Sequence, residues 1–196
     1  ALYIYVQEYR DAGRKIARVG FLGLMGFGKG SGDEVLPHEK TLKAPKEDRL
    51  SLMREVNANL SPIFVLFDDR RRAVTPFLRR FIARHKPFLD LGWDGERHKV
   101  WKMDDPAAIA KVTGGMRGAE LFIADGHHRF ETAKNYAREL EGRGAPADVV
   151  ERAKALMVYF VESDERMLTV LPAHRLPKDV GGMPLPEMVG RLAGSR

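Results

Sequence analysis

The chain has 196 residues, of which 44% are hydrophobic, and it carries 33 Lys+Arg against 27 Asp+Glu for a formal net charge of +6, with no cysteine. This composition can bury a core and excludes a disordered or fibrous chain, while the lack of cysteine excludes disulfides, thiolate nucleophiles and cysteine-ligated metal centres. The mild positive charge favours anionic ligands. No apolar run approaches a membrane span and no signal peptide is visible, so we expect a cytoplasmic protein without a membrane partner.

The first part of the chain predicts a β-hairpin followed by a loop and a helix. Residues 2–9 and 16–25 are rich in aromatic and β-branched residues, and Asp11-Ala12-Gly13 forms a turn between them. The glycine-dense segment Gly23–Gly32 predicts a mobile loop. Its G-x-x-x-x-G-K spacing is not that of a functional P-loop, because Gly30 follows Lys29 where Ser or Thr would bind magnesium. A helix is expected from Pro45, with Leu50, Met53, Val56 and Leu60 at helical spacing.

The rest of the chain alternates strands and helices. Strands are expected over 63–67, 98–103, 121–124 and 155–161, and helices over 74–85, over 105–113 and after Gly126. Asp105-Pro106 is a helix start with a capping aspartate. The alternation is irregular and contains no repeat, which predicts a mixed α/β domain over residues 1–178 that lacks its N-terminal part. Residues 179–196 are expected to be a linker or the start of a further region.

The most informative segment is Asp125-Gly126-His127-His128-Arg129-Phe130-Glu131-Thr132-Ala133, where a buried strand turns directly into a helix. Backbone N–H groups and the positive end of the helix dipole make such a turn an anion site. Gly126 allows close approach of a ligand, and Arg129 could bind phosphate through two hydrogen bonds. Basic residues oppose the dipole of an ordinary helix start, which favours phosphate binding over a purely structural role.

Two other interpretations of this segment stay open. Asp125 could simply cap the helix while the basic side chains point into solvent. Asp125, His127, His128 and Glu131 could also hold a metal, since His128 and Glu131 are three residues apart on one helix. We expect no protein-bound transition metal, because the pattern is generic, and favour a magnesium ion carried by a nucleotide.

Three further polar segments carry weaker signals. The first lies around the start of a helix and contains His38, Glu39, Thr41, Lys43, Asp48 and Arg49, and paired acid and base groups beside hydroxyl and ammonium groups suit proton transfer or phosphate handling. His174-Arg175 forms a second basic pair after a strand. The arginines between residues 70 and 86 form the strongest charge cluster, but no aromatic residues are interleaved as in a nucleic-acid surface, so nucleic acid is not the expected partner.

Together these residues resemble a bacterial domain-of-unknown-function family, number 1015. The resemblance rests on 125–133, on His38-Glu39-x-Thr41 with Asp48-Arg49, on Asn59-x-x-Pro62-Ile63-Phe64 and on Leu171-Pro172-x-His174-Arg175, and it covers roughly residues 1–176. The Asp-Gly-His-His-Arg segment is similar to the phosphate-binding motif of the ParB/sulfiredoxin-like superfamily, which includes an archaeal kinase of free serine. A Pro-Pro-Tyr-Asp type motif that the family carries upstream is missing here.

The resemblance implies a ParB/sulfiredoxin-like fold with a mixed sheet and flanking helices. It also implies a nucleotide of the ATP or ADP class with Mg²⁺, held by Gly126, His127, His128, Arg129, Thr132 and Arg175. In an enzyme, phosphoryl transfer to a small hydroxyl compound such as free serine would use Glu39, Asp125 or His38 as catalytic groups. The alternatives are a non-catalytic nucleotide-binding switch and a domain that binds nucleic acid or a protein partner. The sequence does not predict an oligomeric state.

Overall fold

The computed structural model describes residues 1–27, 35–36, 43–164, 166, 168–169 and 187. Within these residues a single eight-stranded sheet has the order β3-β7-β4-β8-β2-β1-β6-β5. The strands are β1 (Leu2–Asp11), β2 (Arg14–Gly26), β3 (Val35–Leu36), β4 (Ile63–Phe67), β5 (Leu89–Trp93), β6 (Glu96–Met103), β7 (Leu121–Asp125) and β8 (Ala155–Glu162). The pairs β3–β7 and β4–β8 are parallel and the other pairs are antiparallel. The mixed α/β class predicted from the sequence is confirmed.

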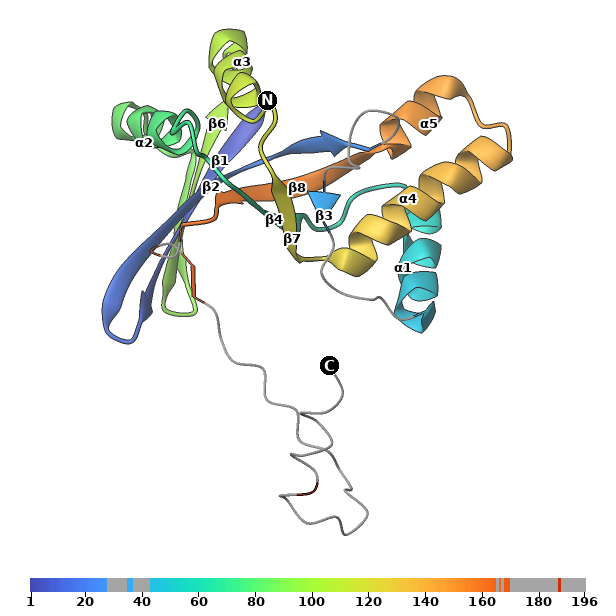
Figure 1. The fold of residues 1–196 in the computed structure, drawn as a ribbon, viewed down its shortest axis with the longest axis horizontal. Coiled ribbons are helices and arrows are strands. Elements are labelled where there is room, and N and C mark those ends of the chain that lie inside the picture. Colours follow the sequence, from blue (N-terminus) through green and yellow to red (C-terminus); the bar gives the residue numbers. More distant parts are fainter. Residues whose placement is uncertain (28–34, 37–42, 165, 167, 170–186, 188–196) are drawn as a thin grey trace.

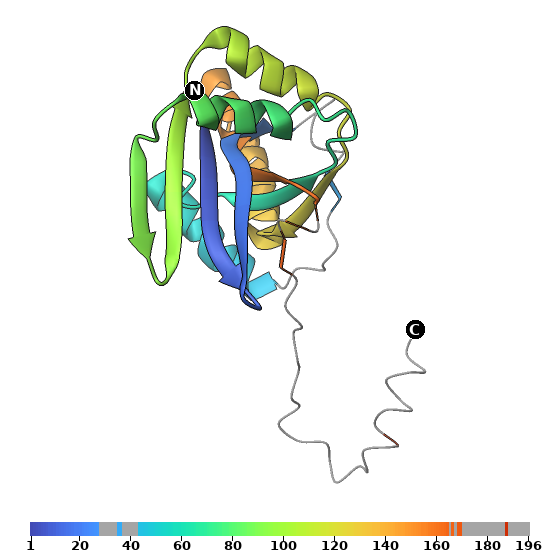
Figure 2. The same cartoon turned by 90° about the vertical axis from the view of Figure 1, so that its left-hand side faces the viewer.

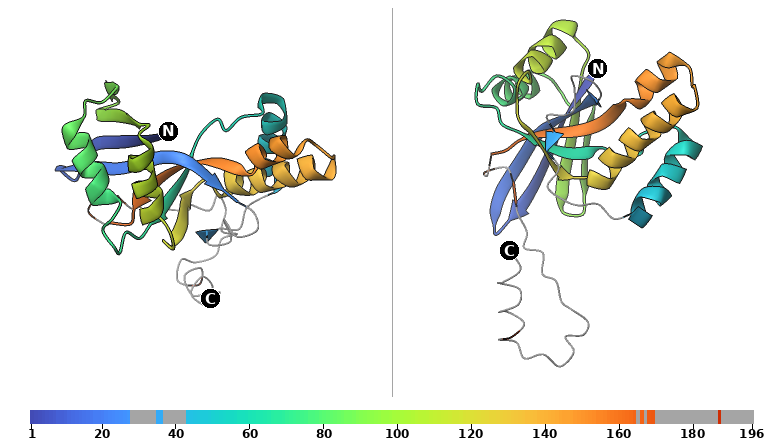
Figure 3. Two further views of the ribbon diagram at one scale, coloured as in Figure 1. Left: turned by 90° about the horizontal axis from the view of Figure 1, so that it is seen from above. Right: turned by 45° about the vertical axis from the view of Figure 1, so that its right-hand side comes forward.

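The helices form two groups at opposite ends of the sheet (Figures 1 and 3). One group is α2 and α3, which lie near β1, β2 and β6 (Figure 2). The other group is α1, α4 and α5, in which α4 contacts both other helices. The helices are α1 (Lys43–Val56), α2 (Thr75–Arg84), α3 (Pro106–Gly115), α4 (His127–Gly142) and α5 (Ala147–Ala153).

One continuous hydrophobic core joins the two helix groups through the sheet. Alternate residues of the central strands point into it, as the period of two in a β-strand requires. Val158 and Phe160 of β8 lie beside Ile63 and Val65 of β4, in a parallel register. Leu78 of α2, Val112 of α3 and Phe130 of α4 belong to the same core. Because α4 packs on this core, the turn that begins it is rigidly placed.

Several predicted element boundaries need correction. Gly23 to Gly26 belong to β2, because their backbone pairs with β8, so the glycine-dense segment does not begin as a loop. Leu60 lies outside α1 and is 61% exposed, although its spacing matched the helix. The short strand β5 was not predicted: it is exposed along its whole length and so lacks the burial pattern of a strand.

Candidate functional site

The turn between β7 and α4 is built around Gly126. Its φ is +98°, in the left-handed region that side chains with a Cβ rarely adopt. A Cβ at this position would lie 2.7 Å from Ile63 Cγ2 and 3.0 Å from Ile63 Cβ, at the start of β4. Both the backbone conformation and the contact therefore require glycine; the close neighbour is Ile63, and the approach of a ligand to Gly126 stays a prediction.

The start of α4 has no side-chain cap. The first helical hydrogen bond runs from Phe130 N–H to Gly126 O at 3.0 Å, so the N–H groups of His128 and Arg129 precede the hydrogen-bonded ladder. The first turn contains no acidic residue, and Gly126 has no side chain with which to cap. The first turn itself thus supplies no carboxylate against the partial positive charge of the helix start, and the nearby carboxylate of Asp125 pairs with Arg129.

Arg129 connects this turn to the start of β4. Its Nη1 donates to Ser61 Oγ at 2.9 Å and to the carbonyl of Pro62, and its Nη2 donates to Asp125 Oδ2. Three of the five guanidinium N–H donors are therefore engaged by the protein. The sequence analysis treated Arg129 as a phosphate ligand; the structure gives it, in addition, a role in holding β4, β7 and α4 together.

The two histidines that follow Gly126 differ in environment. His127 is 6% exposed and borders a hollow of about 270 Å³ on one side of α4, together with Glu131, Lys134 and Arg138. The Nδ1 atom of His128 is buried and has no hydrogen-bond partner in the part of the chain that the structure describes. A buried polar atom without a partner costs free energy, and an external hydrogen-bonding ligand would remove that cost.

Arg129 and Thr132 border a different hollow, on the side of α4 that faces α1. The predicted residues of the 125–133 segment therefore do not converge on one point: His127 and Thr132 line separate hollows. The sequence analysis did not single out Lys134 and Arg138. Their spacing from His127, seven and eleven residues along one helix, is the signal that could have placed them on the same side.

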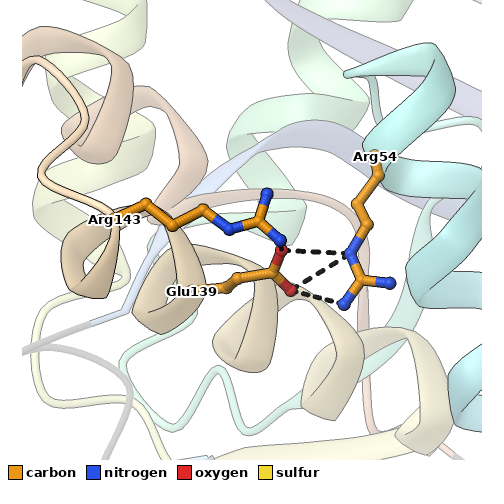
Figure 4. Close-up of polar contacts among 3 residues, drawn as sticks. All are labelled: Arg54, Glu139 and Arg143. Carbon is orange, nitrogen blue, oxygen red and sulfur yellow. Dashed lines mark hydrogen bonds and ion pairs between the residues drawn. The ribbon is translucent and has the colours of Figure 1, made fainter.

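The side of this hollow that α1 forms is joined to α4 by the carboxylate of Glu139, which two arginines share (Figure 4). Glu139 of α4 accepts hydrogen bonds from Arg54 of α1 at 2.6 and 3.1 Å and pairs with Arg143 of α4 at 2.5 Å. The hydrogen bonds from Arg54 hold the pKa of Glu139 below its usual value. This contact holds α1 beside α4, and these two helices border the hollow lined by Arg129 and Thr132.

Several predicted residues lie outside the described part of the chain. They are His38, Glu39, Thr41, Lys29, His174 and Arg175. The expectation that Glu39 approaches the 126–129 turn therefore stays a prediction, and so does the role of Arg175. Among the described residues, no three His, Asp or Glu side chains are placed to hold a metal ion. Within the same residues, no helix is long and apolar enough to cross a membrane.

A family model described as "Protein of unknown function (DUF1015)" matches residues 1–195. The chain belongs to this family. The match extends past residue 176, where the resemblance of the individual motifs ended. No curated protein and no solved structure matches the chain. The further relation to ParB/sulfiredoxin-like proteins therefore stays a prediction.

Proposed function

We propose that this DUF1015 protein binds the phosphate groups of a nucleotide, of the ATP or ADP class with Mg²⁺, at the start of α4. The observation that carries the proposal is the uncapped helix start beside the buried, unpartnered Nδ1 of His128. The N–H groups of His128 and Arg129 supply backbone donors, and the helix dipole favours the negative charge. The left-handed backbone of Gly126 turns the chain directly from β7 into this helix start.

A phosphotransferase activity is the catalytic form of this proposal. Transfer of a phosphoryl group to a small hydroxyl compound requires a base for the hydroxyl proton and a cation for the phosphates. Glu39 is the preferred base and Asp125 the second choice, with His38 beside Glu39. Asp125 is 71% exposed and accepts a hydrogen bond from Arg129, so it also has a structural task. Arg175 is proposed as a further phosphate ligand.

The binding part is tested by titrating ¹⁵N-labelled protein with ADP and magnesium, and separately with inorganic phosphate. We expect saturable shifts of the amides of residues 126–129. The amides at the start of α3 serve as an internal control, because Asp105 already caps Ala108 N–H at 2.7 Å. His128→Phe should weaken binding about tenfold or more, since a hydrogen bond to a charged group contributes roughly 1.5–3 kcal/mol. Equal shifts at both helix starts would show only nonspecific anion binding.

The catalytic part is tested by following loss of ATP with and without a hydroxyl acceptor. Glu39→Gln should preserve nucleotide binding and abolish acceptor-dependent turnover. Saturable nucleotide binding without any turnover would instead support the non-catalytic switch. The basic-surface alternative is not favoured, because Arg70 of that cluster is paired with Asp68 and Glu120 at 2.6 and 3.1 Å.

A further inference from the structure

The strand β5 forms one edge of the sheet, with no strand beyond it among the described residues (Figure 2). An edge strand presents unpaired N–H and C=O groups to which another strand can bond, and proteins often protect such edges with lysine, proline or a bulge. The sequence of β5, Leu-Asp-Leu-Gly-Trp, contains neither lysine nor proline, and its register with β6 runs without a shift. The edge can therefore accept a further strand.

The apolar side chains of β5 lie on one face of the sheet. Leu89, Leu91 and Trp93 alternate with Asp90 and Gly92, so the period of two places the three apolar residues together. Leu89 and Leu91 are each 39% exposed, and Trp93 is 71% exposed. Large apolar side chains on an open edge strand promote association with another chain.

The turn after β5 determines which backbone groups face outward. Asp94 and Gly95 have φ values of +51° and +78°, as in a two-residue type I′ turn directly after Trp93. The residues that close such a turn bond to each other, and the bonding then alternates along the strand. Every second residue counted back from Trp93 therefore bonds to β6, and the N–H and C=O groups of Asp90 and Gly92 point away from the sheet.

Gly92 is not required by its own surroundings. Its φ is outside the left-handed region, and a Cβ at this position would have only Glu96 O within 4 Å, at an ordinary contact distance of 3.8 Å. Glycine inside a strand weakens the strand, and it often marks a place where another backbone approaches closely. In the described part of the chain no other backbone does so at Gly92, which indicates a neighbour from outside the chain.

We propose that β5 pairs antiparallel with β5 of a second copy of this chain, about a two-fold axis that passes beside Leu91. The N–H groups of Asp90 and Gly92 then donate to the carbonyls of Gly92 and Asp90 of the second copy, and the reverse. The same surface of both chains takes part, as in other two-fold dimers. Leu89 lies opposite Trp93 of the second copy, so a smaller side chain faces a larger one.

The charges on the other face agree with this register. Arg97 of β6 lies beside Gly92, between Gly92 and Glu8. In the dimer Asp90 of the second copy lies on the far side of Gly92, where no side chain separates it from Arg97. Lys99 is the next neighbour of Asp90. The row that crosses the interface therefore alternates in sign, which favours pairing.

The neighbouring registers are less favourable. An axis at Asp90 places the two Asp90 carboxylates directly opposite each other. An axis at Gly92 places Asp90 opposite Asp94 of the second copy. Like charges directly opposite each other destabilise a pair of strands, and the axis at Leu91 avoids both pairs.

The association is tested by sedimentation velocity of the full chain over a range of concentrations. The interface is small, so we expect a weak dimer with a dissociation constant on the order of 10–100 µM. Leu91→Lys should raise that constant about tenfold or more, because two ammonium groups would lie opposite each other at the axis. Leu24→Lys is the matched control: it changes an exposed leucine of the inner strand β2 and should leave the constant unchanged.

Cross-linking tests the register independently of affinity. The chain has no cysteine, so Leu91→Cys introduces a single thiol. Opposite residues of a non-hydrogen-bonded pair have Cα atoms about 4.5 Å apart, a distance that a disulfide can span. Oxidised glutathione should therefore link Leu91→Cys into dimers. Leu89→Cys is the control, because Leu89 is equally exposed and its two copies would be about 14 Å apart.

The proposal is overturned if the chain stays monomeric at millimolar concentration, if Leu91→Lys leaves the dimer unchanged, or if Leu89→Cys cross-links as fast as Leu91→Cys. The dimer does not depend on the proposed phosphate site, because β5 and β7 lie toward opposite edges of the sheet. Titration with inorganic phosphate on the same samples separates the two proposals: failure to bind phosphate would overturn the proposed function and leave the dimer in place.

Discussion

The helices α3 and α4 differ in how their first backbone N–H groups are treated: α3 has a side-chain cap and α4 has none among the described residues. Each follows an aspartate, but Asp105 turns its carboxylate back to Ala108 N–H at 2.7 Å, whereas Asp125 directs its carboxylate to Arg129. Before α2, buried Asp69 accepts from the N–H groups of Ala73, Val74 and Thr75, although only Thr75 belongs to the helix and the N-cap residue Val74 has no capping side chain. The difference teaches that an aspartate near a helix start is not sufficient evidence for a cap: Asp105 is the residue directly before α3, whereas Gly126 stands between Asp125 and α4.

The largest expected effect comes from forcing a side chain into the α4 turn. Gly126→Ala should lower the free energy of unfolding by about 3–5 kcal/mol, because it combines left-handed backbone strain with a contact on Ile63. The control is Gly144→Ala, where φ is +69° and a Cβ would meet nothing within 4 Å. Backbone strain alone should cost about 1 kcal/mol there. Urea unfolding measures the free energy of unfolding of both variants. Equal losses of stability in the two variants would mean that the structure shifts to relieve the contact with Ile63.

The next prediction compares the stability lost on removing Asp69, before α2, with the stability lost on removing Asp105, before α3. Asp69→Ala leaves three N–H groups without an acceptor at a position only 6% exposed, and should cost about 3 kcal/mol. Asp105→Ala removes one exposed cap and should cost about 1 kcal/mol. Thermal unfolding of the two variants measures the difference. The ranking would be contradicted if the Asp105 variant were the less stable of the two.

Arg129 tests whether the uncapped turn depends on its connection to β4. Arg129→Gln should cost about 2 kcal/mol, since the carbonyl of Pro62 loses a charged donor and Ser61 loses a partner. Arg152→Gln is a matched control, because that arginine is 73% exposed and pairs with the exposed carboxylate of Asp148. It should change stability by less than about 0.5 kcal/mol. Similar losses in the two variants would remove the structural role of Arg129.

The smallest effect concerns charge beside the turn. Asp125→Asn should change stability little, because the carboxylate is 71% exposed. It removes a negative charge next to the proposed anion site, so phosphate should bind about two- to five-fold more tightly. Titration with inorganic phosphate at low ionic strength measures this, with Asp105→Asn as the control at α3. Weaker binding in the Asp125 variant would mean that its carboxylate takes part in holding the ligand.

The sequence predicted the parts of the fold that depend on local patterns. The buried strand at 63–67, the Asp105 cap and the turn at Gly126 follow from apolar runs, capping chemistry and glycine, and all are found. The strand β5 was missed, because a strand exposed on its whole length leaves little periodic signal. The partition of His127 and Thr132 between two hollows depends on how α1 packs on α4, and that contact has no local signature.

The order of the strands has a consequence for how the protein is made. Among the described residues β8 is the last strand along the sequence, yet it lies in the middle of the sheet, between β4 and β2. Until residues 155–162 leave the ribosome, β4 and β2 each expose an unpaired edge, and the strands on either side cannot join. Such long-range pairings are slow to form and leave edges open to association. A nascent chain that pauses before Ala155 is therefore the form most in need of a chaperone.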